Sequence, residues 1–409
     1  MRKVMIVIPL AVIAMIVGGV YWFWSSFGLF NNVSYSAEIY FVLVALALGG
    51  LLHFIFMDPF KRSNPSLTTN IIGGFTFAFI ISAIFSAALG LASSLVLGVF
   101  GGLSDLAGAF DLGWNHLLYY GALVSFWFGV AIFLGMLYGV FWGRYKFGVT
   151  QIELFFDNLP QEFDGYRIAH ISDMHLGTFD SIRRVGKGID KLQAEKPDLI
   201  LFTGDMVNNI AEEAEPFIDM MKSLKAPDGK YSVLGNHDYA SYVPWKDELS
   251  KQANLEKLMN IESQMGFKLM MNENIAISKG DSSIKLLGVE NWGEPPFPQN
   301  GDLNAALSGV DPSDFKILMS HDPTHWSHEV LKHSNRIDLT LAGHTHGMQF
   351  GIELGKFRWS PVQYRYEMWG GLYQQMNEYL YVNRGFGHHG FPGRLGIWPE
   401  ITIITLRKR

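Results

Sequence analysis

Long apolar segments dominate the first 142 residues of this 409-residue chain and give way to short apolar runs after that point. A helix of about 20 mostly apolar residues is long enough to cross a bilayer. It also satisfies its backbone hydrogen bonds internally, which the membrane interior requires. The pattern predicts an N-terminal four-helix transmembrane region, with spans at about residues 4–24, 39–57, 71–100 and 117–142.

The basic residues of this region predict its orientation. They fall before the first span, between the second and third spans, and after the fourth span: Arg2, Lys3, Lys61, Arg62, Arg144 and Lys146. The two alternate loops hold neither Lys nor Arg. Because cytoplasmic loops carry an excess of these residues, we expect a multi-pass protein of the inner membrane. Both termini and the C-terminal domain should be cytoplasmic.

The rest of the chain has the composition of a soluble α/β protein, so we place the domain boundary between residues 147 and 148. Beyond residue 148 it carries 26 basic and 34 acidic residues. This acidic balance argues against a nucleic-acid partner. The chain contains no Cys, which excludes disulfides and thiolate metal sites.

Five short apolar runs in this domain end in residues that commonly bind metals. Helical stretches separate several of these runs, as in βαβ units. The residues at the five ends are Asp173 and His175, then Asp205, then Asn236 with His237 and Asp238, then His321, and finally His344 and His346. Ligand sites of α/β sheets lie off the carboxyl ends of strands. We therefore expect these side chains to meet.

Each of these ends taken alone could be an ordinary turn or helix cap. Five ends with the same chemistry favour a metal site. Oxygen and nitrogen ligands without thiolates suit manganese, iron, zinc or magnesium. Seven candidate ligands are too many for one ion, so the set predicts two divalent metals that share a carboxylate and activate a hydroxide to attack phosphorus.

The remaining two residues of the third end are candidates for catalysis. His237 follows the candidate ligand Asn236 and is not needed as a ligand, so we expect it to protonate the leaving group or to stabilise transition-state charge. Asp238 has two alternative roles: it could orient His237 through a hydrogen bond, or it could cap a turn.

These motifs resemble, in their order along the chain, those of the calcineurin-like metallophosphoesterases. The resemblance covers about residues 150–409 and implies a four-layer α/β/β/α sandwich. It implies that Asp173, His175 and His346 hold one metal, that Asn236, His321 and His344 hold the other, and that Asp205 bridges them. Manganese is the metal we favour. The residues around these motifs resemble a membrane-attached bacterial branch, whose members have been linked to lipid-linked phosphoesters that include UDP-diacylglucosamine.

A glycine-rich segment near the C-terminus supplies candidates for substrate contact. His388 and His389 either face the substrate or lie in a surface loop, and Arg384 and Arg394 could clamp a phosphate. The aromatic and basic stretch 357–374 is either a membrane-surface patch or a packed insert.

Attachment to a membrane favours a lipid-linked phosphoester as substrate, either a phospholipid or a UDP-acylglucosamine-type lipid, because anchoring raises its local concentration. One alternative is a tethered phosphodiesterase that acts on a soluble nucleotide. Another is a sensor or transporter that a phosphoesterase domain regulates.

Overall fold

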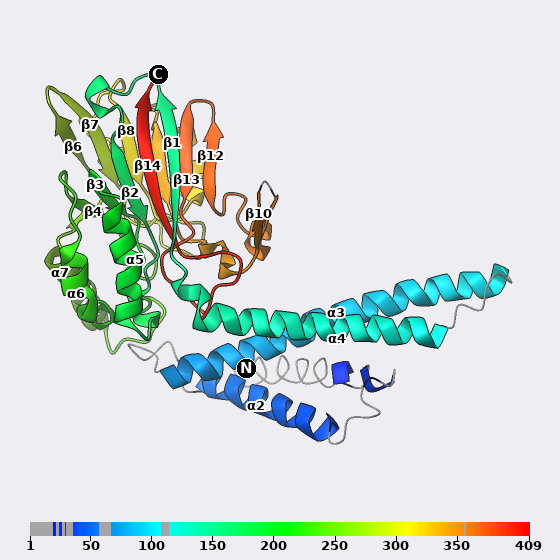
Figure 1. Ribbon diagram of the computed structural model, residues 1–409. Coiled ribbons are helices and arrows are strands. Elements are labelled where there is room, and N and C mark those ends of the chain that lie inside the picture. The colour runs from blue at the N-terminus through cyan, green and yellow to red at the C-terminus, as the bar shows by residue number, and fades with distance from the viewer. Residues whose placement is uncertain are drawn as a thin grey trace. The chain divides into compact units, whose positions relative to one another are not determined.

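The computed structural model describes residues 36–56, 67–107 and 114–409 apart from 356, together with residues 19–21, 24–26 and 29. The chain forms two compact units (Figure 1). The first unit lies within residues 1–141. The second consists mainly of residues 142–409.

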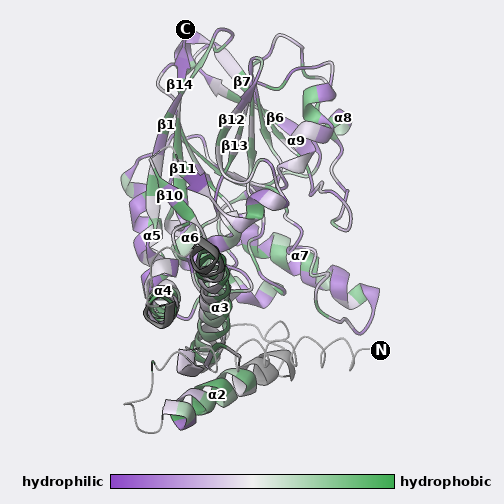
Figure 2. Cartoon of the chain, turned by 90° about the vertical axis from the view of Figure 1, so that its right-hand side faces the viewer, coloured by the Kyte–Doolittle hydropathy of each residue, from purple (hydrophilic) through white to green (hydrophobic). Residues whose placement is uncertain are grey.

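Long helices make up the described part of the first unit: α2 (Ser36–Phe56), α3 (Leu67–Ala107) and α4 (Trp114–Phe141). Two segments, residues 71–100 and 117–145, are apolar and long enough to cross a membrane. α2 is also hydrophobic (Figure 2), but its apolar part, Ser36–Gly50, is shorter than either of these two segments. The structure therefore gives two candidate spans where the sequence predicts four. Most of the predicted span at 4–24 lies outside the described residues.

The second unit is built on two six-stranded mixed sheets. In spatial order, the first sheet contains β1 (Gly148–Phe156), β14 (Glu400–Lys408), β2 (Arg167–Ile171), β3 (Leu199–Phe202), β4 (Lys230–Ser232) and β5 (Lys268–Leu269). Strands β2 to β5 run parallel, β14 runs antiparallel to β2, and β1 is parallel to β14.

The second sheet has a similar mixture of directions. In spatial order it contains β12 (Gly371–Gln375), β13 (Glu378–Val382), β9 (Leu339–Ala342), β8 (Lys316–Met319), β7 (Ser282–Gly288) and β6 (Glu273–Lys279). The four central strands are parallel, and each edge strand is antiparallel to its neighbour. A separate hairpin pairs β10 (Ile352–Leu354) with β11 (Phe357–Trp359).

Helices cover the outer faces of the two sheets. They are α5 (Ile182–Ala194), α6 (Ile218–Ser223), α7 (Glu248–Gln264), α8 (Leu303–Ala306) and α9 (Thr324–His328). α5 illustrates why they form: Ser181 caps its first turn by accepting a hydrogen bond from the Arg184 N–H. Its buried residues Val185, Ile189 and Leu192 recur at helical spacing. α5 is thus one of the helical stretches expected between the short apolar runs.

The alternation of side chains along buried strands explains how the layers stack. Leu199 and Leu201 of β3 join the core between the sheets, whereas Ile200 and Phe202 join the core under α5, α6 and α7. A third core lies between the second sheet and α8 and α9. The layers therefore run helix, sheet, sheet, helix, and central strands such as β3, β8 and β9 are buried on both faces.

Candidate metal centre

The seven candidate ligands follow five strands, and the structure brings them together. Asp173 and His175 follow β2, Asp205 follows β3, and Asn236 follows β4. In the second sheet, His321 follows β8, while His344 and His346 follow β9. The carboxyl ends of these parallel strands share one end of the sandwich (Figure 1). This arrangement places residues that are far apart in the sequence within contact distance.

One group of ligand atoms forms around two imidazoles. The Nε2 atoms of His175 and His346 lie 3.0 Å apart. His346 Nε2 is 3.3 Å from Asp173 Oδ1, and His175 Nε2 is 3.5 Å from Asp205 Oδ2. We call these four residues the first ligand set.

A second group forms beside it. His344 Nδ1 lies 2.8 Å from Asn236 Oδ1 and 3.3 Å from His321 Nε2. His321 Nε2 is in turn 3.3 Å from the same Asp205 Oδ2. Asp205 therefore belongs to both groups. We call Asp205, Asn236, His321 and His344 the second ligand set.

The electrostatics of both sets suit divalent cations. Burial lowers the pKa of His175 and His346 well below the usual range, so both rings are neutral, as metal ligands must be. Burial alone would also lower the pKa of His321, but the Asp205 carboxylate raises it to about 10. A proton on His321 thus balances the buried carboxylate, and a bound cation could take over this role. The donors are oxygen and nitrogen atoms of the kind that manganese, iron, zinc and magnesium accept.

The loops that carry the ligands adopt an uncommon backbone conformation. Five ligands have φ in the left-handed region: Asp173 (52°), His175 (42°), Asp205 (60°), His344 (72°) and His346 (51°). This region is rare for residues other than glycine. Close packing explains two neighbouring glycines. A Cβ on Gly343 would lie 1.9 Å from Ser172 Oγ, and one on Gly235 would lie 2.2 Å from Asp205 Oδ1.

Neighbouring groups orient the ligands. His321 Nδ1 donates to the Thr203 carbonyl oxygen over 2.6 Å, which leaves Nε2 for a metal. The hydroxyl of Tyr366 lies 2.8 Å from His344 Nε2. The amide of Asn236 donates from Nδ2 to the Tyr242 hydroxyl over 2.8 Å. Both tyrosines were missed in the sequence because the bonds they make depend on how distant loops fold.

The structure selects one of the two roles expected for Asp238. Its carboxylate accepts hydrogen bonds from four main-chain N–H groups, those of Asp205, Met206, Val207 and Gly235, at 2.8–3.2 Å. His237 Nδ1 donates instead to the main-chain oxygen of Asn208. Asp238 thus fastens the Asp205 loop to the Asn236 loop, and its expected contact with His237 is replaced by this structural role.

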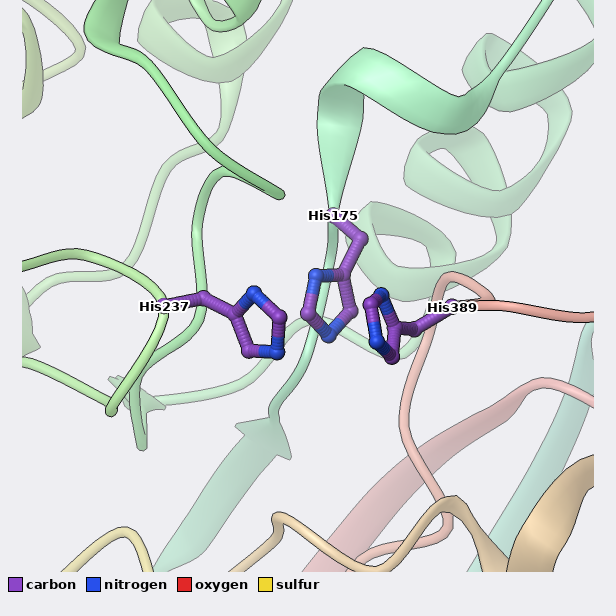
Figure 3. Close-up of side chains that lie close together, drawn as sticks. All are labelled: His175, His237 and His389. Atoms are coloured by element: carbon purple, nitrogen blue, oxygen red, sulfur yellow. The ribbon is translucent and has the colours of Figure 1, made fainter. Parts of the chain in front are cut away.

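Asn208 holds two histidines beside the first ligand set. His237 Nδ1 donates to its main-chain oxygen over 2.7 Å, and His389 Nδ1 donates to its side-chain oxygen over 2.6 Å. Figure 3 shows the His237 and His389 rings close to the ring of His175. Because both protons lie on Nδ1, any substrate contact is made through Nε2. Asn208 lies in no recognisable sequence motif, so only the fold reveals its contacts.

The other expected substrate residues are placed differently. Arg384 is held by Glu353 at 2.7 Å and Glu400 at 2.9 Å. The Arg394 guanidinium is fully buried and donates to three main-chain oxygens, and its Nη2 lies 3.1 Å from His346 Nδ1. His388 is buried with its ring against Phe179. The polar groups of both arginines already have partners, which argues against phosphate binding by either one. The burial of His388 argues against its lying in a surface loop.

A cleft of about 580 Å³ opens onto both ligand sets. The residues that line it are Asp205, Asn236, His237, Tyr242, Phe297, His344, Thr345, His346, Met348, Val362, Arg365, Tyr366 and His389. One part of the wall is polar and carries the ligands, and another is apolar. His389 is thus the one expected substrate residue that the structure places at the cleft.

Comparison with known proteins decides the family. A family model described as calcineurin-like phosphoesterase matches residues 166–348. An uncharacterized metallophosphoesterase of Bacillus subtilis, YkuE, is 32% identical over 254 residues, which cover 61% of this chain and 82% of that protein. The chain belongs to the calcineurin-like metallophosphoesterases. It is therefore a metal-dependent phosphoester hydrolase, of a family that binds a dimetal centre.

Two other proteins are similar to this chain at lower identity. A transmembrane protein with metallophosphoesterase domain from Danio rerio is 27% identical over 272 residues, covering 64% of this chain and 57% of that protein. The UDP-2,3-diacylglucosamine pyrophosphatase LpxG of Chlamydia trachomatis is 28% identical over 280 residues, covering 56% and 81%. Together with the two apolar helices, these similarities suggest a membrane-associated metallophosphoesterase.

Proposed function

We propose that this chain is a membrane-anchored dimetal phosphoesterase that hydrolyses a phosphoester or pyrophosphate bond of a lipid-linked substrate. The observation that carries the proposal is that two ligand sets share Asp205. Both sets face a cleft with a partly apolar wall. The candidate membrane helices and the similarity to a diacylglucosamine pyrophosphatase support a substrate of the UDP-acylglucosamine type or a phospholipid.

The ligand sets would hold two divalent cations, and manganese is our choice. Asp173, His175 and His346 would bind one cation, Asn236, His321 and His344 the other, and Asp205 both. When bound, two such cations polarise the phosphoryl oxygens and acidify a water nucleophile. The buried neutral imidazoles and the carboxylates fix the geometry in advance.

His237 would act on the leaving group. Its Nδ1 proton is engaged by Asn208, so the protonated ring delivers a proton from Nε2 to the departing oxygen as the bond between phosphorus and that oxygen breaks. Its main-chain N–H donates to Asp205 Oδ1 over 2.8 Å, which ties its position to the shared carboxylate. His389 would contact the substrate from the same side of the cleft.

Four membrane spans with both termini in the cytoplasm remain our proposal for the topology of the chain. It rests on the six basic residues that fall on one side of the predicted spans. A reporter fused after Arg409 should show cytoplasmic behaviour. A periplasmic signal would reverse the orientation.

The experiment that tests the function uses the full chain, purified in detergent with added manganese. It compares bis-p-nitrophenyl phosphate, p-nitrophenyl phosphate, phospholipids and UDP-linked lipids, with Asp205→Asn as the inactive control. Selective turnover of a lipid supports the proposal. Turnover of soluble nucleotides in preference to lipids would favour the tethered phosphodiesterase, and no turnover by the metal-loaded chain would remove the enzymatic role.

A further inference from the structure

One permanent positive charge lies at the cleft. Among the described residues that line it, Arg365 is the single Lys or Arg. Its side chain is 53% exposed. Its guanidinium carbon lies over the Tyr366 ring, 5.0 Å from the centroid, and the Tyr366 hydroxyl contacts the ligand His344. One tyrosine ring therefore separates this charge from the second ligand set.

Glu294 holds Arg365 in place without burying it. Arg365 Nη1 lies 3.0 Å from Glu294 Oε2, and the other carboxylate oxygen is 2.8 Å from His328 Nε2. An exposed ion pair of this kind contributes about 0–1 kcal/mol. An anionic group of a substrate can therefore displace the carboxylate. The planar guanidinium also matches a phosphate group better than an ammonium does.

The cleft thus offers three kinds of contact in one space. The ligand sets receive the reacting phosphoryl group, Arg365 offers a charge, and Phe297, Met348 and Val362 provide an apolar wall. Phe297 also stands edge-on to the His344 ring, with centroids 4.7 Å apart. A simple monoester would reach neither Arg365, which would stay paired with Glu294, nor the apolar wall. A substrate with two linked phosphates and an apolar portion would engage all three.

We propose that Arg365 is a specificity-determining residue that binds the second phosphate of a diphosphate substrate. The proposal deepens the proposed function and rests on it. In the reaction a water oxygen forms the new bond to the attacked phosphorus and loses its proton to solvent. The bond from that phosphorus to the bridging oxygen breaks, its electron pair stays on that oxygen as part of the second phosphate, and His237 Nε2 supplies the proton that the oxygen then takes up. Arg365 stabilises the charge that this departing phosphate gains.

The test measures binding as well as turnover. The manganese-loaded full chain is titrated calorimetrically with imidodiphosphate, which resists hydrolysis, and with inorganic phosphate. Arg365→Gln should weaken imidodiphosphate binding about tenfold or more, as expected for loss of a charged hydrogen bond. Phosphate binding should change less than about twofold, because phosphate reaches only the ligand sets.

Two further variants test the opposite effect on imidodiphosphate affinity and provide a control with no expected change. Glu294→Gln removes the competing carboxylate and should tighten imidodiphosphate binding. Arg183→Gln removes an exposed arginine of α5 that does not line the cleft, and it should change neither affinity.

The proposal is overturned if Arg365→Gln weakens both anions equally or weakens neither, or if the unaltered chain binds no imidodiphosphate. Turnover separates it from the proposed function. Binding that depends on Arg365 without hydrolysis of any ester would refute only the function. Hydrolysis with Arg365 irrelevant to diphosphate binding would refute only this inference.

Discussion

The two sheets contribute chemically different halves to one candidate metal centre. The loops of the first sheet supply every candidate oxygen ligand, from Asp173, Asp205 and Asn236, together with the imidazole of His175. The loops of the second sheet supply only imidazoles, from His321, His344 and His346. Each ligand set takes members from both sheets, so neither sheet can form a site alone. The core between the sheets is therefore what brings the halves of the centre together.

The largest effect should come from the carboxylate that both sets share. Asp205→Asn removes the negative charge between His175 and His321 and should lower kcat by more than the roughly 10³-fold cost of losing one oxyanion donor. Metal content measured by mass spectrometry should fall below that of Asn236→Ala, which touches one set. Equal losses in the two variants would argue against sharing.

A smaller effect is expected where the first sheet contributes a residue that is not a ligand. His237→Gln should lower kcat by about 10²- to 10⁴-fold, the range for loss of an acid or base. Metal content should stay that of the unaltered chain. Loss of metal from this variant would show that His237 is a ligand.

The contribution of the second sheet can be tested through a residue that contacts one of its histidines. Tyr366→Phe removes the hydroxyl beside His344 Nε2 and should weaken metal affinity about 10- to 100-fold, as losses of such supporting groups do. Tyr364→Phe is a matched control, because Tyr364 is 80% exposed. An unchanged metal titration for Tyr366→Phe would mean that packing alone orients His344.

The smallest effect concerns the side of the first sheet, where a buried glutamate in α7 should make the stability of the fold depend on pH. Burial, together with the nearby Asp238 carboxylate, raises the pKa of Glu262, in α7, to about 8. One of its carboxylate oxygens accepts from the Ser232 hydroxyl, and the other has no partner among the described residues.

The folded state therefore keeps the Glu262 proton while the unfolded chain loses it above its ordinary pKa of about 4.5. Stability is full below that value and is lost as pH rises towards 8. Glu262→Gln removes this loss, so its melting temperature should exceed that of the unaltered chain by several degrees at pH 9 and match it near pH 4. Glu256→Gln, exposed on the same helix, should show no such trend.

The sequence identified the side chains that cluster in the candidate metal centre better than it identified their surroundings. Asp205 and His344 could be found because each directly follows a short strand, and strand ends converge in any sheet of this class. Tyr366, Tyr242 and Asn208 could not be found, since their roles depend on how loops fold back onto the ligands. For Arg384 the structure adds a contact that the sequence could not show: its charge near a glycine-rich segment indicates phosphate binding, but Glu353, 31 residues away, pairs with it.

In the first unit, too, the sequence predicted some features and left others open. Apolar length alone predicted the segments near 71–100 and 117–142, which the structure contains as helices. It also marked residues 39–57, where α2 forms with a shorter apolar part. Length cannot tell a membrane helix from one that packs on its neighbours, because the same apolar residues serve both purposes.

The left-handed backbone of five ligands has a consequence for how this family evolves. A non-glycine residue in that conformation costs about 1–3 kcal/mol, and such backbone strain concentrates at functional sites, so we expect it to accompany metal binding by these loops. A descendant that no longer needs the reaction gains stability when these positions drift to glycine. We therefore expect relatives that have lost the ligands to melt at higher temperatures than active ones. We also expect glycine at the positions where active relatives carry ligands with positive φ.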